Sequence, residues 1–157
     1  MINKRLGMAA LFFGIIVLPV SASMISFLVL ETGLPPEANI VGYADVWEDG
    51  IMGAFFDEGH IVSNYPAMRA ENYPEELIPL EARGDYEEAF RGGAEFFVLV
   101  LLEYKPQGGI GRPLGVSIWS FTAEDDIEAV KNPIYQIRFP SNIGLNLRDE
   151  YVRAQET

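Results

Sequence analysis

His60 is the single histidine of this chain, and the chain has no cysteine. Any reaction that needs an imidazole base would therefore depend on this one residue. The segment 115–119, Gly-Val-Ser-Ile-Trp, lacks the second glycine of the turn that exposes a nucleophilic serine. Because His60 directly follows a predicted helix end at Gly59, we interpret it as a residue at the negative end of a helix dipole. No catalytic residue is predicted.

Two clusters of carboxylates have the chemistry of calcium ligands, since calcium needs only oxygen atoms. The clusters are Asp85, Glu87 and Glu88, and Glu124, Asp125 and Asp126. Neither has the alternating acidic spacing and the glycine of a calcium-binding loop. We interpret the first cluster as helix-capping residues and the second as a solvated turn. With one histidine and no cysteine a zinc site is not expected either, so neither a metal nor a cofactor is predicted.

The glycine-rich segment 107–113, Gln-Gly-Gly-Ile-Gly-Arg-Pro, has the composition of a phosphate-binding loop. It lacks the Lys-Ser/Thr pair of a P-loop, and a predicted strand rather than a helix follows it. We interpret it as a hairpin loop in which Arg112 can meet an anion or a partner's carboxylate. Trp47 and Trp119 could line a sugar site served by two carboxylates, but each stands in an apolar pattern that favours core packing.

Composition limits the function classes. The chain has 157 residues, of which 49% are hydrophobic, and a formal net charge of −12. This length suits one domain with a hydrophobic core. The negative charge argues against nucleic acid and anionic lipid surfaces as partners, because both would repel the protein. The lack of cysteine excludes disulfides, thiolate metal sites and a lipidated N-terminal cysteine.

Residues 1–22 have the pattern of a secretory signal peptide. Lys4 and Arg5 precede an uncharged apolar run from residue 6 to residue 20, and small residues follow at Ser21 and Ala22. The pattern predicts cleavage between Ala22 and Ser23. The alternative is an uncleaved membrane anchor over residues 6–30, none of which is charged. Both readings place the remaining domain, residues 23–157, outside the cytoplasm, and a membrane is a partner only in the second.

The hydropathy pattern predicts an α/β fold, with α+β as the alternative. We expect one domain with a mixed central sheet of about four or five strands and two main helices packed on it. The segment 64–83, which contains three prolines, is predicted to be mostly loop with a turn near 75–78. A short helix capped by Thr122 is expected within 122–132. The predicted strands are 24–31, 60–63, 94–104, 114–121 and 134–139, and the predicted helices are 40–56, 85–91 and 146–154.

Two of these predictions have specific signals. The first helix should begin near Ile40 with Asn39 as its cap, and its apolar residues recur every four positions. The second should open with a capping box in which Asp85 is the cap and Glu88 stands three residues later. Strands 94–104 and 114–121 should pair antiparallel, because the 105–113 loop between them is too short for a crossover helix.

Two phrases of the chain resemble a known family. They are residues 55–62, Phe-Phe-Asp-Glu-Gly-His-Ile-Val, and residues 92–100, Gly-Gly-Ala-Glu-Phe-Phe-Val-Leu-Val. In this arrangement of a helix end and a strand opening, residues 25–121 resemble the small envelope α/β domains related to the N-terminal domain of TolB and to the curli secretion protein CsgG. The chain departs from the family pattern at Glu95, where aspartate is common, and at Leu102-Glu103, where glycine is usual. The resemblance implies a non-enzymatic part in envelope assembly, secretion or partner recruitment.

The sequence thus predicts an exported, acidic, non-catalytic protein of the periplasm or cell surface that binds another envelope protein. The expected binding surface is the segment 64–83 together with the loop 105–113, since long loops on a rigid sheet often carry function. Its candidate residues are Tyr65, Tyr73, Ile110 and Arg112. A small hydrolase using carboxylates or His60, and a carrier of calcium or a small ligand, are the alternative functions.

Overall fold

The two longest apolar strands form the middle of the sheet. They are β1 (Met24–Thr32) and β4 (Phe96–Glu103), which pair in parallel. Nearly all their side chains are buried on both faces, as in sheets covered by helices on two sides. The computed structural model describes residues 21–34, 43–70, 82–104, 113–126, 130, 132–139 and 147–157.

The described residues form a mixed sheet of six strands with the order β2-β1-β4-β5-β6, and β3 also pairs with β1. β1 runs parallel to β2, β3 and β4, whereas β5 is antiparallel to both β4 and β6. The chain is a single α/β domain, as predicted. The other strands are β2 (Ile61–Asn64), β3 (Met68–Ala70), β5 (Gly115–Phe121) and β6 (Tyr135–Arg138).

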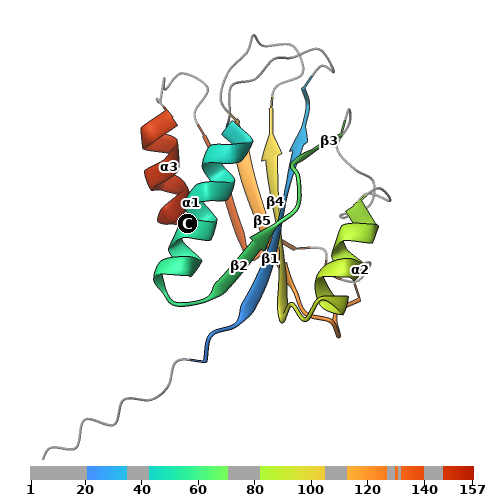
Figure 1. Cartoon of the computed structure of the whole chain (residues 1–157). Coiled ribbons are helices and arrows are strands. Elements are labelled where there is room, and N and C mark those ends of the chain that lie inside the picture. Colours follow the sequence, from blue (N-terminus) through green and yellow to red (C-terminus); the bar gives the residue numbers. More distant parts are fainter. Residues whose placement is uncertain are drawn as a thin grey trace, which may run out of the picture.

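The three helices of the described residues divide the core into two layers, one on each side of the sheet. Helices α1 (Tyr43–Asp57) and α3 (Leu147–Gln155) cover one face, and α2 (Arg83–Arg91) covers the other (Figure 1). Because side chains alternate along a strand, Phe27 packs with Trp47 on the α1 face, and Leu28 packs with Trp119 on the α2 face. Both tryptophans are therefore core residues, as expected.

Helix α1 confirms the predicted apolar face. Trp47 and Ile51 are buried, and Tyr43 and Phe55 are partly buried against the same core. The predicted start at residue 40 and the cap at residue 39 lie outside the described residues. Gly59 has a φ of +91°, which confirms the left-handed glycine expected after the helix.

Between β2 and β4, the structure adds a strand that was not predicted and contradicts one prediction. The segment 64–83 contains the short strand β3, whose backbone pairs with the end of β1, and the turn predicted near 75–78 lies outside the described residues. Helix α2 has Ala82 as its N-cap with no side-chain cap hydrogen bond, so the capping box of Asp85 does not form. Ala82 is fully buried. Packing of the first turn therefore sets the start of this helix, and Asp85 lies inside it, where a negative charge favours the helix dipole.

The antiparallel pairing of β4 with β5 is confirmed, and so are the strand β6 and the terminal helix α3. After β5, Thr122 donates from its backbone nitrogen and its hydroxyl to the carboxylate of Asp125, over 2.6 and 2.9 Å. Residues 127–129 of the short helix expected here lie outside the described residues.

Candidate functional site

The carboxyl ends of three parallel strands meet at one edge of the sheet. Thr32, at the end of β1, is the register partner of Ala70 in β3 on one side and of Glu103 in β4 on the other. The chain leaves β3 into residues 71–81 and leaves β4 into residues 105–112. The two predicted binding segments therefore depart from the same edge, on either side of one residue. We call this region the carboxyl edge.

The carboxyl edge also holds the switch point of the topology. The chain passes from β1 through α1 to β2 on one side, and then through α2 to β4 on the other side of β1. In open α/β sheets, ligands bind outside the carboxyl ends of the strands where the strand order reverses. The ends of β1 and β4 form such a place.

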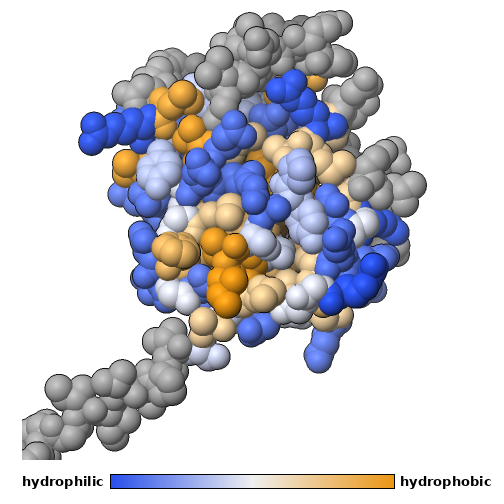
Figure 2. All heavy atoms as spheres, in the orientation of Figure 1, coloured by the Kyte–Doolittle hydropathy of each residue, from blue (hydrophilic) through white to orange (hydrophobic). Residues whose placement is uncertain are grey.

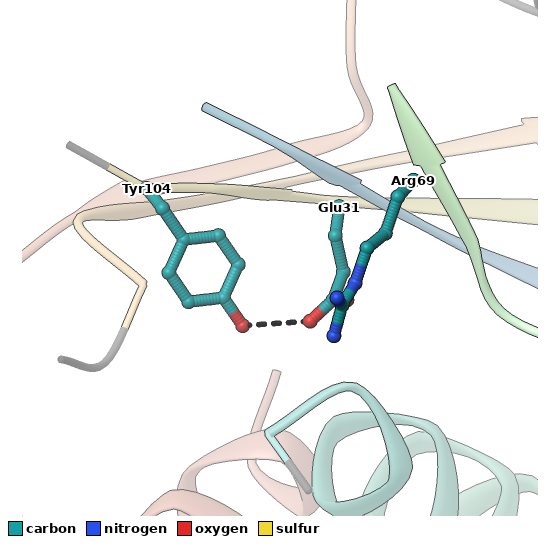
Figure 3. A network of polar contacts seen from close by, with 3 residues as sticks. All are labelled: Glu31, Arg69 and Tyr104. Atoms are coloured by element: carbon teal, nitrogen blue, oxygen red, sulfur yellow. Dashed lines mark hydrogen bonds and ion pairs between the residues drawn. The ribbon is translucent and has the colours of Figure 1, made fainter. Parts of the chain in front are cut away.

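A buried polar cluster stands at this switch point (Figure 3). Glu31 of β1, which is 5% exposed, accepts a hydrogen bond from the hydroxyl of Tyr104 over 3.0 Å. Its second oxygen accepts from Nε of Arg69 in β3, also over 3.0 Å. Glu31 projects to the α1 side, because it follows Phe27 and Val29 on the same face of β1. The cluster joins three segments that are distant in the sequence.

The electrostatics of the cluster favour one protonation state. Burial, followed by the charge of Glu31 and the hydrogen bond to it, raises the pKa of Tyr104 well above its usual value. Tyr104 therefore remains a hydrogen-bond donor at any physiological pH. The side chain of Arg69 is 42% exposed, so it joins the buried carboxylate to the protein surface. The arrangement holds the ends of β1, β3 and β4 in fixed positions.

A second ion pair fixes the opposite face of the same edge. Nη1 of Arg138 in β6 lies 2.7 Å from Oε2 of Glu103 in β4. The pair crosses β5 above Gly115, where an added Cβ would lie 2.9 Å from the carboxylate oxygen and 3.0 Å from the guanidinium nitrogen. Glycine is therefore needed at this position for the pair to form.

The structure describes one of the four candidate binding residues. Tyr65 is partly buried between β2 and β3, with its ring centroid 6.4 Å from that of Phe97. Its backbone nitrogen donates to the carbonyl of Phe27, and burial raises the pKa of its phenol. Tyr65 thus supports the α2 face of the core. Tyr73, Ile110 and Arg112 lie outside the described residues.

His60 takes part in a structural contact at the opposite edge of the sheet. Its Nδ1 accepts a hydrogen bond from the backbone nitrogen of Ser23 over 3.2 Å. Its ring packs edge-on against Phe55, with the centroids 5.9 Å apart. Its place after the last turn of α1 matches the sequence interpretation.

The acidic clusters have local roles in the described part of the chain. The pKa of Asp125 is lowered because its carboxylate accepts hydrogen bonds from Thr122. In α2, Arg91 lies 3.6 Å from Glu87, one turn earlier. Among the described residues, no group of three or more histidine, aspartate or glutamate side chains is placed to hold a metal ion.

The polar cluster itself is absent from the sequence predictions. Its members are separated by 38 and 73 positions along the chain, and only the parallel pairing of the strands brings them together. The available signal was a polar residue at the end of each long apolar run: Glu31 directly follows the first run, and Tyr104 is the second residue after the other.

No protein-family model matches this chain, and no curated protein matches it significantly. In the part of the chain that the structure describes, no helix is both long enough and apolar enough to cross a membrane.

Proposed function

We propose that this chain is exported from a bacterial cytoplasm and acts in the envelope as a non-catalytic domain that binds another protein. The observation that carries the proposal is the convergence at the carboxyl edge. Thr32 has Ala70 on one side and Glu103 on the other, so the segments 71–81 and 105–112 start about two strand spacings apart, roughly 10 Å. Two long segments anchored on a rigid sheet can form one continuous recognition surface.

The polar cluster supports this function by fixing the base of that surface. Binding loses less conformational entropy when the residues that present the contacts are already ordered. Glu31, Arg69 and Tyr104 tie together the strands from which both segments depart.

Export is supported by the leader pattern and by the position of β1. Residues 25–30 are buried in the central strand, so a membrane anchor that coexists with this fold cannot use them. An uncleaved membrane span would then have to lie before β1, so it would be shorter than the uncharged run 6–30. Cleavage after Ala22 leaves the whole of β1 in the mature domain.

The resemblance to the TolB and CsgG domains is consistent with this proposal. In the family pattern, a helix end is followed later in the chain by the opening of a central strand. In this chain, the end of α1 is likewise followed, after β2, β3 and α2, by the central strand β4. It favours a protein partner in envelope assembly or secretion.

The test is a capture experiment on the exported protein. We would place an affinity tag at residue 157, cross-link in intact cells and quantify the co-purifying proteins. Tyr73→Ala, Ile110→Ser and Arg112→Ala are expected to weaken capture of the same partner, each by about tenfold if it is central to the contact, which corresponds to about 1.4 kcal/mol.

Matched controls lie away from the carboxyl edge. Ile134→Ser repeats the isoleucine change at a residue that is 70% exposed at the start of β6. Arg91→Ala repeats the arginine change at the exposed end of α2. Both controls should leave capture unchanged. If replacing residues 71–81 and 105–112 with short flexible linkers leaves every partner bound, the proposed surface is wrong.

A further inference from the structure

Ser23 is held from both sides at the edge opposite the carboxyl edge. Its carbonyl accepts a hydrogen bond from the nitrogen of Ile61 over 2.9 Å. Its nitrogen donates to Nδ1 of His60 over 3.2 Å, and its hydroxyl donates to Oε2 of Glu95 over 3.1 Å. His60 precedes β2 and Glu95 precedes β4, the two strands that flank β1. Ser23 therefore links the amino ends of three strands.

The ordered contacts begin at the residue where the predicted cut would create a new chain end. Ser21 and Ala22 are exposed, whereas Ser23 is partly buried. Large apolar side chains are exposed around this edge. Phe56 is 67% exposed and Ile61 is 56% exposed, and Figure 2 shows hydrophobic surface over β2, close to where the chain enters the domain. The polar contacts of Ser23 place its nitrogen against an imidazole and its hydroxyl against a carboxylate.

We propose that His60 and Glu95 together form a binding site for the α-ammonium group of the mature protein. The inference rests on the proposed export and on cleavage between Ala22 and Ser23. A signal peptidase hydrolyses that peptide bond with one water molecule. The carbonyl carbon of Ala22 takes the hydroxyl, the nitrogen of Ser23 takes the hydrogen, and the released amine then binds a proton.

The α-ammonium group has more hydrogen-bond donors than the peptide group that it replaces, and His60 and Glu95 offer acceptors for them. The peptide nitrogen of Ser23 has one hydrogen, which it gives to Nδ1 of His60, whereas an ammonium has three. The carboxylate of Glu95 already accepts from the hydroxyl of the same serine, and in the proposed site it accepts one of the added donors. Besides Glu95, the exposed Asp57 and Glu58 stand three and two residues before His60 in the chain. All are acidic and favour a positive charge.

The site has two consequences for the exported protein. The ammonium would tie β1 to the segments before β2 and β4 more strongly than the peptide group does, because hydrogen bonds between charged groups are stronger. A neighbouring carboxylate also raises the pKa of an amine, which is about 7.7–8.0 when unperturbed. The α-amine should then react slowly with electrophiles near neutral pH.

The experiment uses the chain recovered from the envelope, whose mass first establishes its N-terminus. The protein is then treated near pH 7 with a limiting amine-reactive ester, and labelling of Ser23 is followed by mass spectrometry. Glu95→Gln should label about threefold faster than the wild type, since half a pKa unit corresponds to about threefold. Asp45→Asn removes the same charge from an exposed position in the first turn of α1, and it should label at the wild-type rate.

His60 offers a second readout, because its imidazole signals are the only ones in the NMR spectrum. In the wild type, the ¹⁵N shifts should show Nδ1 as the acceptor, and blocking the Ser23 amine by carbamylation should move them. Equal labelling of wild type and Glu95→Gln, with imidazole shifts that do not respond to blocking, overturns the ammonium site alone. A recovered chain that begins elsewhere overturns both the cut and the site, while cell fractionation decides separately whether the protein is exported.

Discussion

Glu31 has the sequence context of an exposed strand end but is a buried hydrogen-bond acceptor in the fold. After the run 24–30, in which every residue except Ser26 is apolar, a glutamate is typical of the solvated end of a strand. In the structure it is buried at the switch point, where the Tyr104 hydroxyl and the Arg69 guanidinium satisfy its two oxygens. A buried carboxylate is tolerated only when paired and hydrogen-bonded. The cluster should therefore be stable only while both oxygens of Glu31 keep their hydrogen-bond donors, and loss of one donor should destabilise the protein.

Tyr104→Phe tests that contribution. The substitution removes one hydrogen bond to a buried charged acceptor and leaves an oxygen of Glu31 without its donor. We expect the free energy of unfolding to fall by about 1–3 kcal/mol, measured by urea denaturation at neutral pH. Tyr135→Phe is the control, because Tyr135 packs partly buried on the same face of the sheet and is not a member of the cluster.

The pH dependence of the Tyr104→Phe effect distinguishes the hydroxyl from simple packing. The folded pKa of Tyr104 is raised, so the unfolded chain loses its phenolic proton first, near pH 10. Stability that comes from this group is fully present below pH 10 and is lost as the pH rises above it. The wild type should therefore lose more stability above pH 10 than Tyr104→Phe does. Parallel losses in the two proteins would contradict the role given to the hydroxyl.

Glu48 in α1 is a buried carboxyl whose charge should lower the stability of the protein. Burial raises the pKa of its carboxyl, and the nearby charges of Asp49 and Asp45 add to the effect, while a hydrogen bond from Asn64 opposes it. Because the folded pKa is raised, the stability that the proton provides is present below the unfolded value of 4.5 and is lost as the pH rises through the folded pKa. The charged form thus costs stability at neutral pH.

Glu48→Gln should therefore stabilise the protein at pH 7. Relief of one like-charge neighbour on a helix is worth about 0.2–0.5 kcal/mol, and we expect a gain of at least that size. The gain should shrink as the pH falls below 4.5, where the wild-type carboxyl is protonated as well. Chemical denaturation at several pH values measures it, and a variant that is destabilised at pH 7 would show that the charge of Glu48 is needed.

At the scale of elements, α1 and α3 form a closely packed pair on one face of the sheet. Nε1 of Trp47 donates to the carboxylate of Glu150 over 3.1 Å in a buried position. One turn along α1, a Cβ added at Gly50 would lie 2.5 Å from the Cβ of Ala154 and 2.9 Å from the carbonyl oxygen of Tyr151. Gly50, which weakens the helix by intrinsic propensity, therefore permits the approach of the two helices.

Two alanine substitutions in α1 should differ in their effect on stability. Gly50→Ala would gain up to about 1 kcal/mol of helix propensity but must push α3 away, which costs typically about 1–3 kcal/mol. Gly53→Ala gains the same propensity, and its Cβ would meet only the ends of two side chains, at 3.3 and 3.6 Å. We expect Gly50→Ala to lower the thermal midpoint and Gly53→Ala to leave it unchanged or raise it. Equal midpoints would mean that α3 does not pack against α1 as described.

The elements that the sequence predicted well are those with long, regular patterns. The apolar run of β4, the four-residue recurrence in α1 and the alternation in β5 each depend on burial that is repeated many times along the element. β3 has only three residues and forms by pairing with the backbone of β1, so no local sequence pattern predicts it. The predicted start of α2 was wrong because the helix begins after a buried alanine, Ala82, rather than after a polar cap.

For the molecule as a whole, the sequence does not reveal which parts of the chain meet. The sheet class followed from the alternation of strands and helices, but the position of β1 between β2 and β4 is a property of the three-dimensional packing. That position carries both proposed sites, because it gathers the two binding segments at the carboxyl edge and brings His60 and Glu95 to Ser23 at the opposite edge. Among the candidate binding residues, Tyr65 was assigned to a loop surface although its ring also packs on the core.

The strand order can be tested directly, because the chain has no cysteine of its own. Cysteines introduced at Ala70 and Glu103 would flank Thr32, two strand spacings apart, at roughly 10 Å. A bismaleimide of about that span should link them efficiently. In the control pair, Ala70→Cys is combined with Glu95→Cys, which lies at the amino end of β4, eight residues and about 26 Å away from position 103. This pair should stay unlinked in the folded protein. In urea, where the protein is unfolded, the two pairs should no longer differ in the yield of cross-linking. If the two pairs react equally under native conditions, β3 and β4 do not end at the same edge, and the surface proposed for the partner does not exist.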